Sequence, residues 1–256
     1  MKANSGEVIS FGFGAAGVNI MDTICKQVSL EHDVSQPSPI GNWQKYFSET
    51  NDSGKIVPRV IMADLESDQI DPLRHGQSIP YRPSNLISGK ESSANNYVRG
   101  HYTLGRYLLE KITEATRKES EKCDHVDSLH LHFSQCGGTA GLASAVAERL
   151  SVDYCKNEKI FFTELPSPNT GKSPLDHYNA ILGIHDCIGT SDLMVYYQNE
   201  KLYDIFNNNF GCYTNGSYNS VNYLLSLAYS DITSPIRFGT ATASKIFTIT
   251  PTQVKS

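Results

Sequence analysis

The sequence of 256 residues has no run of lysines and arginines, no Cys-x-x-Cys pair and no apolar segment long enough to cross a bilayer. The formal net charge is −5 at pH 7. This charge and the lack of a basic run argue against a nucleic acid as partner. The six cysteines stand singly, so they indicate neither a disulfide framework nor a zinc ribbon. The first residues contain no apolar signal region. We therefore expect a soluble, cytoplasmic protein with free thiols and no membrane partner.

The composition excludes several other classes of protein. Apolar residues make up 39% and charged residues 19% of the chain, with 19 glycines and 11 prolines. These values do not fit a coiled coil, a collagen-like repeat or a fully disordered chain. The length corresponds to between one and two domains and is sufficient to bury a core.

Apolar segments of strand length alternate with helical patterns. The strands are predicted at residues 7–11, 58–64, 128–133, 159–163 and 193–197, and the helices at 104–122, 142–150, 178–185 and 221–229. This order predicts an α/β fold, a Rossmann-like, mostly parallel sheet flanked by helices. We expect loops at 32–42 and 48–55. Ligands of such sheets bind beyond the carboxyl ends of the strands, so the loops after Phe11, Asp64 and Phe133 should line one site.

A first glycine cluster follows the first strand and precedes a helix. It runs from Gly12 to Gly17 and has the pattern G-x-G-x-x-G. Glycines there let the backbone approach a phosphate, and the helix N-terminus supplies free N–H groups. A nicotinamide dinucleotide site also needs an acid about 20 residues later, at the end of the next strand. The next predicted strand ends only at Asp64, which disfavours a dehydrogenase; a tight turn without a ligand is the other alternative.

A second glycine cluster extends from Ser134 to Gly141 and also lies between a strand and a helix. Its consecutive N–H groups form a nest for an anion, although the ending G-K-[ST] of a P-loop is missing. Two such turns in one sheet predict a nucleotide phosphate held from two sides. Asp64 and Glu66 lie at the end of a predicted strand. Acids at such a place can hold Mg²⁺ beside phosphates, and the alternative interpretation is a helix cap or a surface acid.

Other polar groups allow simpler interpretations. Cys123, His125, His130 and His132 do not have the spacing of a common zinc site, and we interpret the last two as a partly buried strand face. Residues 207–209, all asparagine, are typical of a polar helix end or a turn. Asp176 is followed by a histidine, but no nucleophile motif accompanies the pair.

Several longer strings occur in a fixed order along the chain. They are residues 14–20, 30–32, 57–59, 64–66, 89–103, 148–154, 178–179, 199–200, 203–205 and 237–238. Together they resemble the tubulin family over nearly the whole chain up to Phe238, and the first two resemble its alpha members rather than its beta members.

The resemblance implies a GTP-binding α/β domain with a six-stranded parallel sheet, of the tubulin/FtsZ type. Residues 1–238 would form this domain with its core helix, and 239–256 a degenerate tail; most of the second domain and the C-terminal helices of the family would be absent. The implied cofactors are GTP and Mg²⁺. The implied partner is beta-tubulin or another tubulin subunit, and the implied role is a structural one in the microtubule cytoskeleton.

The resemblance also implies individual roles. Glu66 would approach Mg²⁺ and the γ-phosphate, and Asp176 would bind the ribose. Asn199 and Asn222 would read the guanine edge, because amides both donate and accept hydrogen bonds, and Tyr218 would stack on the base. The phosphate loops would contain Gly14, Ala15, Gly17, Ala94, Asn95, Ser134, Gly138 and Thr139.

The chain departs from the family's pattern at several of these places. Ala15 replaces a glutamine, Ser92 an acid, and Lys172 a small hydroxyl residue; the second cluster has Cys136 and Ala140 in its glycine signature and is one residue short. Residues 239–246 contain no acid where alpha members carry one that acts on a partner's nucleotide. We therefore expect weakened or absent hydrolysis and assign no catalytic residue.

Two further expectations follow from the resemblance. Without a covering domain, Val221, Leu224, Leu225 and Leu227 should be exposed. The alternatives to a structural tubulin are a regulatory or vestigial fragment that binds a tubulin partner without polymerising, and a GTPase that acts alone.

Overall fold

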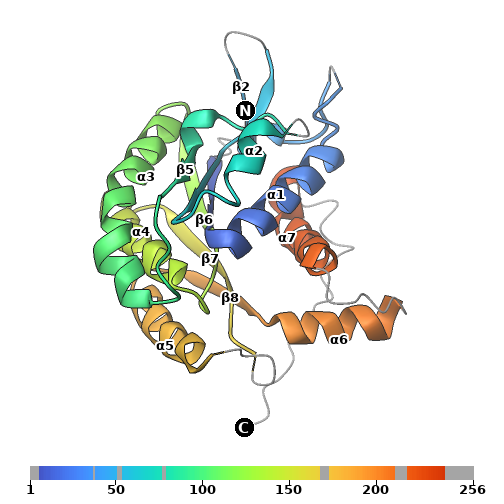
Figure 1. Ribbon diagram of the computed structural model, residues 1–256. Coiled ribbons are helices and arrows are strands. Elements are labelled where there is room, and N and C mark those ends of the chain that lie inside the picture. Colours follow the sequence, from blue (N-terminus) through green and yellow to red (C-terminus); the bar gives the residue numbers. More distant parts are fainter. Residues whose placement is uncertain are drawn as a thin grey trace.

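The computed structural model describes residues 6–36, 38–50, 54–76, 79–167, 173–210 and 218–239. Its centre is a six-stranded sheet (Figure 1) in the order β5-β4-β1-β6-β7-β8. All neighbouring strands of this sheet pair in parallel, which confirms the predicted fold class. The strands are β1 (Glu7–Phe13), β4 (Val60–Asp64), β5 (Leu86–Ser88), β6 (Val126–Ser134), β7 (Glu158–Glu164) and β8 (Leu193–Tyr197).

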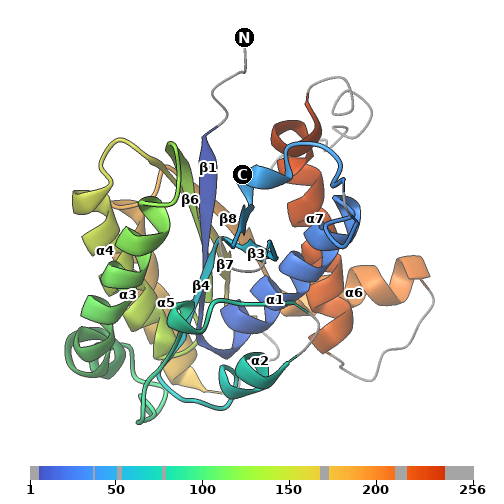
Figure 2. The same ribbon diagram turned by 90° about the horizontal axis from the view of Figure 1, so that it is seen from above.

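Helices cover both faces of the sheet, as Figure 2 shows. On one face lie α3 (Gly105–Ser120), α4 (Thr139–Asp153) and α5 (Pro174–Ile188). On the other face lie α1 (Gly14–Glu31) and α7 (Tyr218–Phe238), packed against each other. Side chains alternate between the two cores, so that Ile9, Phe11 and Phe13 of β1 face α3 and α4, whereas Val8 faces α1.

The same alternation explains the two histidines of β6. His130 and His132 face α1 and α7, opposite to the leucines of that strand, as the sequence predicts. They are not partly buried, however, but only 1% and 2% exposed, because Phe162 and Tyr229 enclose them. Burial lowers the pKa of each imidazole to about 3, so both side chains are neutral members of the core.

The expectation that α7 leaves its apolar side chains exposed is wrong in part. Val221 is only 1% exposed, and the three leucines that follow are half-buried, because α7 packs against α1. The C-terminal end of α7 is anchored by Arg237, which is completely buried. Its Nη1 lies 2.6 Å from Oε2 of Glu31 in α1, and its Nη2 donates to the carbonyl oxygen of Ser230 at 2.9 Å.

Smaller elements complete the molecule. They are the hairpin β2 (Phe47–Glu49) and β3 (Ile56–Pro58), the helices α2 (Asp71–His75) and α6 (Asn199–Phe210), the 3₁₀-helices η1 (Trp43–Lys45) and η2 (Pro83–Asn85), and the π-helix η3 (Arg99–Leu104). The predicted loop at 48–55 is therefore wrong at its start, where residues 48–49 belong to β2, whereas it ends as predicted directly before β3. The polar run 207–209 ends α6, as predicted. No helix within the described residues is long and apolar enough to span a membrane.

Candidate functional site

Two helix N-termini meet at the carboxyl edge of the central strands. Helix α1 begins at Gly14, directly after β1, and α4 begins at Thr139, shortly after β6. Neither helix has a side chain as its N-terminal cap, and neither has an acidic residue in its first turn. In α4 the N–H groups of Ala140 and Gly141 donate to the carbonyl oxygens of Gly137 and Gly138, both at 3.1 Å. The other N–H groups of the two first turns and the positive ends of two helix dipoles lie at the same edge, which is an arrangement suited to an anion such as phosphate.

Glycine is required where these two turns touch. A Cβ atom on Gly14, whose φ is +70°, would lie 2.4 Å from Oγ1 of Thr139. A Cβ atom on Gly17 would lie 2.1 Å from the carbonyl oxygen of His132. Thr139 belongs to the second glycine cluster, so the two clusters of the sequence are in direct contact at this edge.

The loop after β5 reaches the same edge. Ala94 and Asn95 both have left-handed backbones, with φ of +50° and +55°. Nδ2 of Asn95 donates to Oδ1 of Asp176, in the first turn of α5, at 2.8 Å. Two residues that the resemblance assigned to different parts of the nucleotide are therefore neighbours.

Asn179 joins this loop to the second glycine cluster. Its side chain donates to the carbonyl oxygens of Asn95 and Cys136, at 3.0 and 3.1 Å, and accepts from the N–H of Tyr97 at 3.1 Å. Asn179 is only 4% exposed. No role was predicted for it from the sequence, although an amide inside an otherwise apolar helix face is a signal that such a residue bonds to backbone groups.

Three acids gather after β4. Asp64 is buried and accepts a hydrogen bond from the N–H of Leu65 at 2.7 Å, whereas Glu66 and Asp68 are exposed. Burial, together with the charges of Glu66 and Asp68, raises the pKa of Asp64 to about 6. A divalent cation would offset this repulsion, so the carboxylates fit Mg²⁺ at the position that the sequence predicts.

The end of β7 carries an acid that was not predicted from the sequence. Glu164 accepts a hydrogen bond from the side chain of Asn199 and interacts with the hydroxyl of Ser134, and burial raises its pKa. It therefore joins a residue assigned to the phosphates with one assigned to the guanine. Its only sequence signal is its place as the last residue of a strand.

The remaining residues assigned to the base lie in α7. Tyr218 is 63% exposed and Asn222 is half-buried, and α7 packs against α6, which begins with Asn199. Among the described residues, no hydrogen bond joins Tyr218 or Asn222 to Asn199. Ala15 is exposed in the first turn of α1. Lys172 and residues 240–256 lie outside the described part of the chain.

A cavity of about 400 Å³ lies beside this edge, between the start of the loop after β5 and α3. Leu65, Gly89, Lys90 and Tyr107 are among its lining residues, and none of the predicted site residues is. The convergent glycines and helix N-termini, rather than this cavity, carry the chemistry expected of a phosphate site.

Comparisons with known proteins agree with this architecture. The family described as "Tubulin/FtsZ family, GTPase domain" matches residues 7–207. The tubulin alpha-1 chain of Emericella nidulans is 36% identical over 245 residues, which cover 91% of this chain and 54% of that protein. The tubulin alpha-3 chain of Saccharomyces cerevisiae and the tubulin alpha-1 chain of Arabidopsis thaliana are also 36% identical over 91% of this chain.

The chain thus spans about half the length of the curated relatives that it matches. The resemblance found in the sequence is confirmed by these relatives and by the parallel six-stranded sheet. The chain belongs to the Tubulin/FtsZ family, of which it contains the GTPase domain.

Proposed function

We propose that this chain is an alpha-tubulin-like protein whose residues 1–238 bind GTP with Mg²⁺ at the carboxyl edge of the sheet. The observation that carries the proposal is the contact between Gly14 and Thr139, which brings two uncapped helix N-termini together. A nucleotide phosphate is the ligand that such paired N-termini accept best. Family membership makes guanine the expected base.

Different residues at the carboxyl edge of the sheet would bind different parts of the nucleotide. N–H groups of the first turns of α1 and α4, with the hydroxyls of Ser134 and Thr139, would bind the phosphates. Glu66 would hold Mg²⁺, which neutralises phosphate charge when bound. Asp176 would accept from the ribose, and Asn199 and Asn222 would pair with the guanine edge beneath Tyr218. Only backbone groups would be contributed by Ala15, Gly17, Ala94 and Gly138. The side chain of Asn95 would position Asp176.

Hydrolysis by this chain alone should be weak or absent. Ala15 is exposed in the first turn of α1 and offers no polar side-chain atom to orient a water molecule. Residues 239–246 contain no acidic residue. General base catalysis needs such a group within hydrogen-bond reach of the attacking water.

The proposed partner is another tubulin subunit, beta-tubulin first. The outer side of α5 supports a protein partner, because Leu175, Tyr178, Ile181 and Ile188 are each at least 50% exposed there. These exposed side chains fit two roles equally well. The first is a structural role in microtubules, and the alternative is that of a regulatory subunit that binds a tubulin partner without polymerising. Sedimentation with beta-tubulin separates the two roles: this chain pellets with polymer in the first and stays with soluble partner in the second.

The nucleotide proposal is tested by thermal or urea unfolding with GTP and Mg²⁺, with ATP for comparison. A ligand at 100 times its dissociation constant should add about 2.7 kcal/mol of stability. Asn199→Ala should remove most of the preference for GTP, whereas Asn208→Ala, at an exposed position of the same helix, should not. Equal stabilisation by GTP and ATP would refute guanine recognition, and no stabilisation of the folded protein would refute nucleotide binding.

A further inference from the structure

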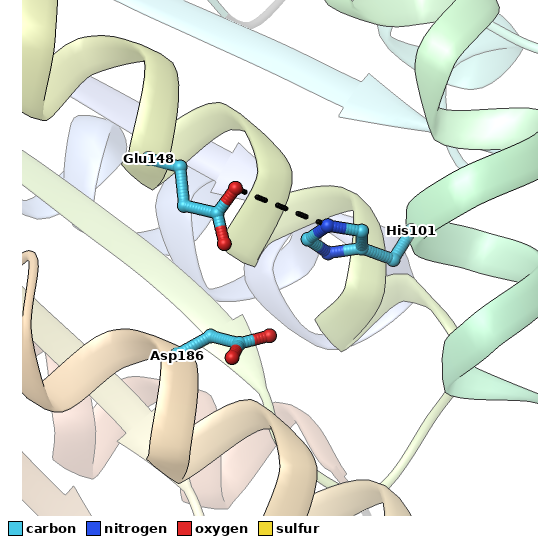
Figure 3. Close-up of side chains that lie close together, drawn as sticks. All are labelled: His101, Glu148 and Asp186. Carbon is cyan, nitrogen blue, oxygen red and sulfur yellow. Dashed lines mark ion pairs between the residues drawn. The ribbon is translucent and has the colours of Figure 1, made fainter.

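Three potential metal ligands meet between helices, away from the predicted nucleotide residues. They are His101 of η3, Glu148 of α4 and Asp186 of α5, and Figure 3 shows their side chains pointing toward one another. One ligand atom from each lies within 4.8 Å of the other two. Within the described part of the chain, no other group of three histidine, cysteine or acidic side chains is this close.

The backbone explains why these elements approach so closely. A Cβ atom on Gly141 of α4 would lie 2.6 Å from the backbone nitrogen of His101, so only glycine lets η3 press against α4 there. Glu148 follows Gly141 by two helical turns and therefore lies on the same face of α4. On α5, a Cβ atom on Gly183 would lie 2.1 Å from the side-chain oxygen of Gln135 and 3.6 Å from Cβ of Ala140 in α4, and Asp186 lies one turn further along.

The imidazole of His101 has an unmet bonding requirement. His101 is only 8% exposed, and its Nδ1 is buried without a hydrogen-bond partner. Its Nε2 lies 3.9 Å from Oε2 of Glu148, which is longer than a hydrogen bond. A buried ring nitrogen without a partner is costly, and a coordinated cation is one of the few ligands that satisfies it.

The two acids have complementary surroundings. One carboxylate oxygen of Asp186 accepts a hydrogen bond from the hydroxyl of Tyr97, which fixes the orientation of the carboxylate and leaves its other oxygen available. Such an outer hydrogen bond is typical of a metal-binding carboxylate. The side chain of Glu148 is 49% exposed, so it reaches solvent and provides a path of entry for an ion.

We propose that His101, Glu148 and Asp186 bind one divalent transition-metal ion, with Zn²⁺ as the best fit. One imidazole and two carboxylates form a borderline donor set, which suits Zn²⁺ better than Mg²⁺ or Ca²⁺, whose ligands are oxygens alone. Three protein ligands leave a fourth position for water. The ion would tie η3, and through it the loop after β5, to α4 and α5.

The test uses the full chain, freed of metal with a chelator and free of nucleotide, and titrated with Co²⁺ and then Zn²⁺. We expect one Co²⁺ per chain, with visible d–d absorption that Zn²⁺ abolishes. Glu148→Gln and Asp186→Asn keep the size of each side chain and should weaken binding at least about tenfold, and Tyr97→Phe by about tenfold. His75→Gln, at an exposed histidine of α2, should leave binding unchanged.

Three outcomes would overturn the proposal. Near-ultraviolet charge-transfer bands would show that cysteine thiolates, such as that of the exposed Cys155, bind the ion instead. Unchanged affinity in folded Glu148→Gln and Asp186→Asn would place the ion elsewhere. Absence of uptake by folded wild-type protein would mean that the cluster binds no such metal. Because no nucleotide is present, none of these results depends on the proposed function.

Discussion

Replacing Asp64 by asparagine should make the nucleotide-free protein more stable at neutral pH and weaken its binding of Mg²⁺. Asp64 is 5% exposed, and burial, with the charges of Glu66 and Asp68, raises its pKa from 3.8 to about 6. Asparagine has nearly the same size, and its carbonyl oxygen can still accept the hydrogen bond from the N–H of Leu65. The substitution therefore removes little except the negative charge.

The size of the effect follows from the two pKa values. The folded protein binds this proton more tightly than the unfolded chain does, so ionisation of Asp64 destabilises the fold as the pH rises from 3.8 to about 6. At 1.36 kcal/mol per pH unit, the cost is about 0.6 kcal/mol at pH 4, about 1.6 at pH 5 and about 3 at pH 7. An uncharged amide at this position does not titrate, so Asp64→Asn should gain these amounts of stability.

Urea unfolding of both proteins at pH 5, 6 and 7 measures this gain, because other titrating groups cancel in the difference. Asp68→Asn is the control: this acid of the same loop is exposed, and its loss should change stability by less than about 0.5 kcal/mol. Millimolar Mg²⁺ should narrow the difference between wild type and Asp64→Asn, since the cation stabilises the ionised carboxylate. A difference that does not change with pH, or that favours the wild type at pH 7, would refute the reasoning.

Three other substitutions have defined outcomes. His132→Phe should make the free energy of unfolding less sensitive to acid. Burial lowers the pKa of His132 to about 3, so the wild type loses up to about 1.4 kcal/mol of stability for each pH unit below 6.5. Urea unfolding of both proteins from pH 7 to pH 5 measures this difference. Arg237→Met should cost about 3 kcal/mol in equilibrium unfolding, because it removes the buried partner of Glu31; an unchanged midpoint would contradict this. Gly17→Ala should cost about 1–3 kcal/mol and lower the stabilisation by GTP, while Gly189→Ala, whose Cβ would meet nothing within 4 Å, should do neither.

The strands of five or more residues could be predicted because each coincides with an apolar segment enriched in β-branched and aromatic residues. β5 was missed because only three residues pair, between Leu86 and Ser88. The hairpin of β2 and β3 was missed because its strands are equally short and flank a polar, glycine-containing stretch that is typical of a loop. Pairing that depends on a distant partner leaves too little local signal.

At the candidate site, the glycine turns were visible because a strand, a glycine cluster and a helix follow one another in the sequence. Glu164 and Asn179 were not visible, because their significance comes from partners far along the chain. Asn179 bonds to the backbone of Asn95 and of Cys136, which belong to two other loops. His132 was placed on the correct face of its strand, but its full burial depends on Phe162 and Tyr229, which come from other elements.

The position of β1 in the middle of the sheet has a consequence for synthesis. All seven residues of β1 are buried in the folded protein, yet β1 pairs only with β4, which begins at Val60, and β6, which begins at Val126. The ribosome makes about 5–20 residues per second, so this apolar strand leaves the exit tunnel long before its second neighbour exists. Nascent chains of this protein should therefore need a chaperone to shield β1 until β6 has emerged.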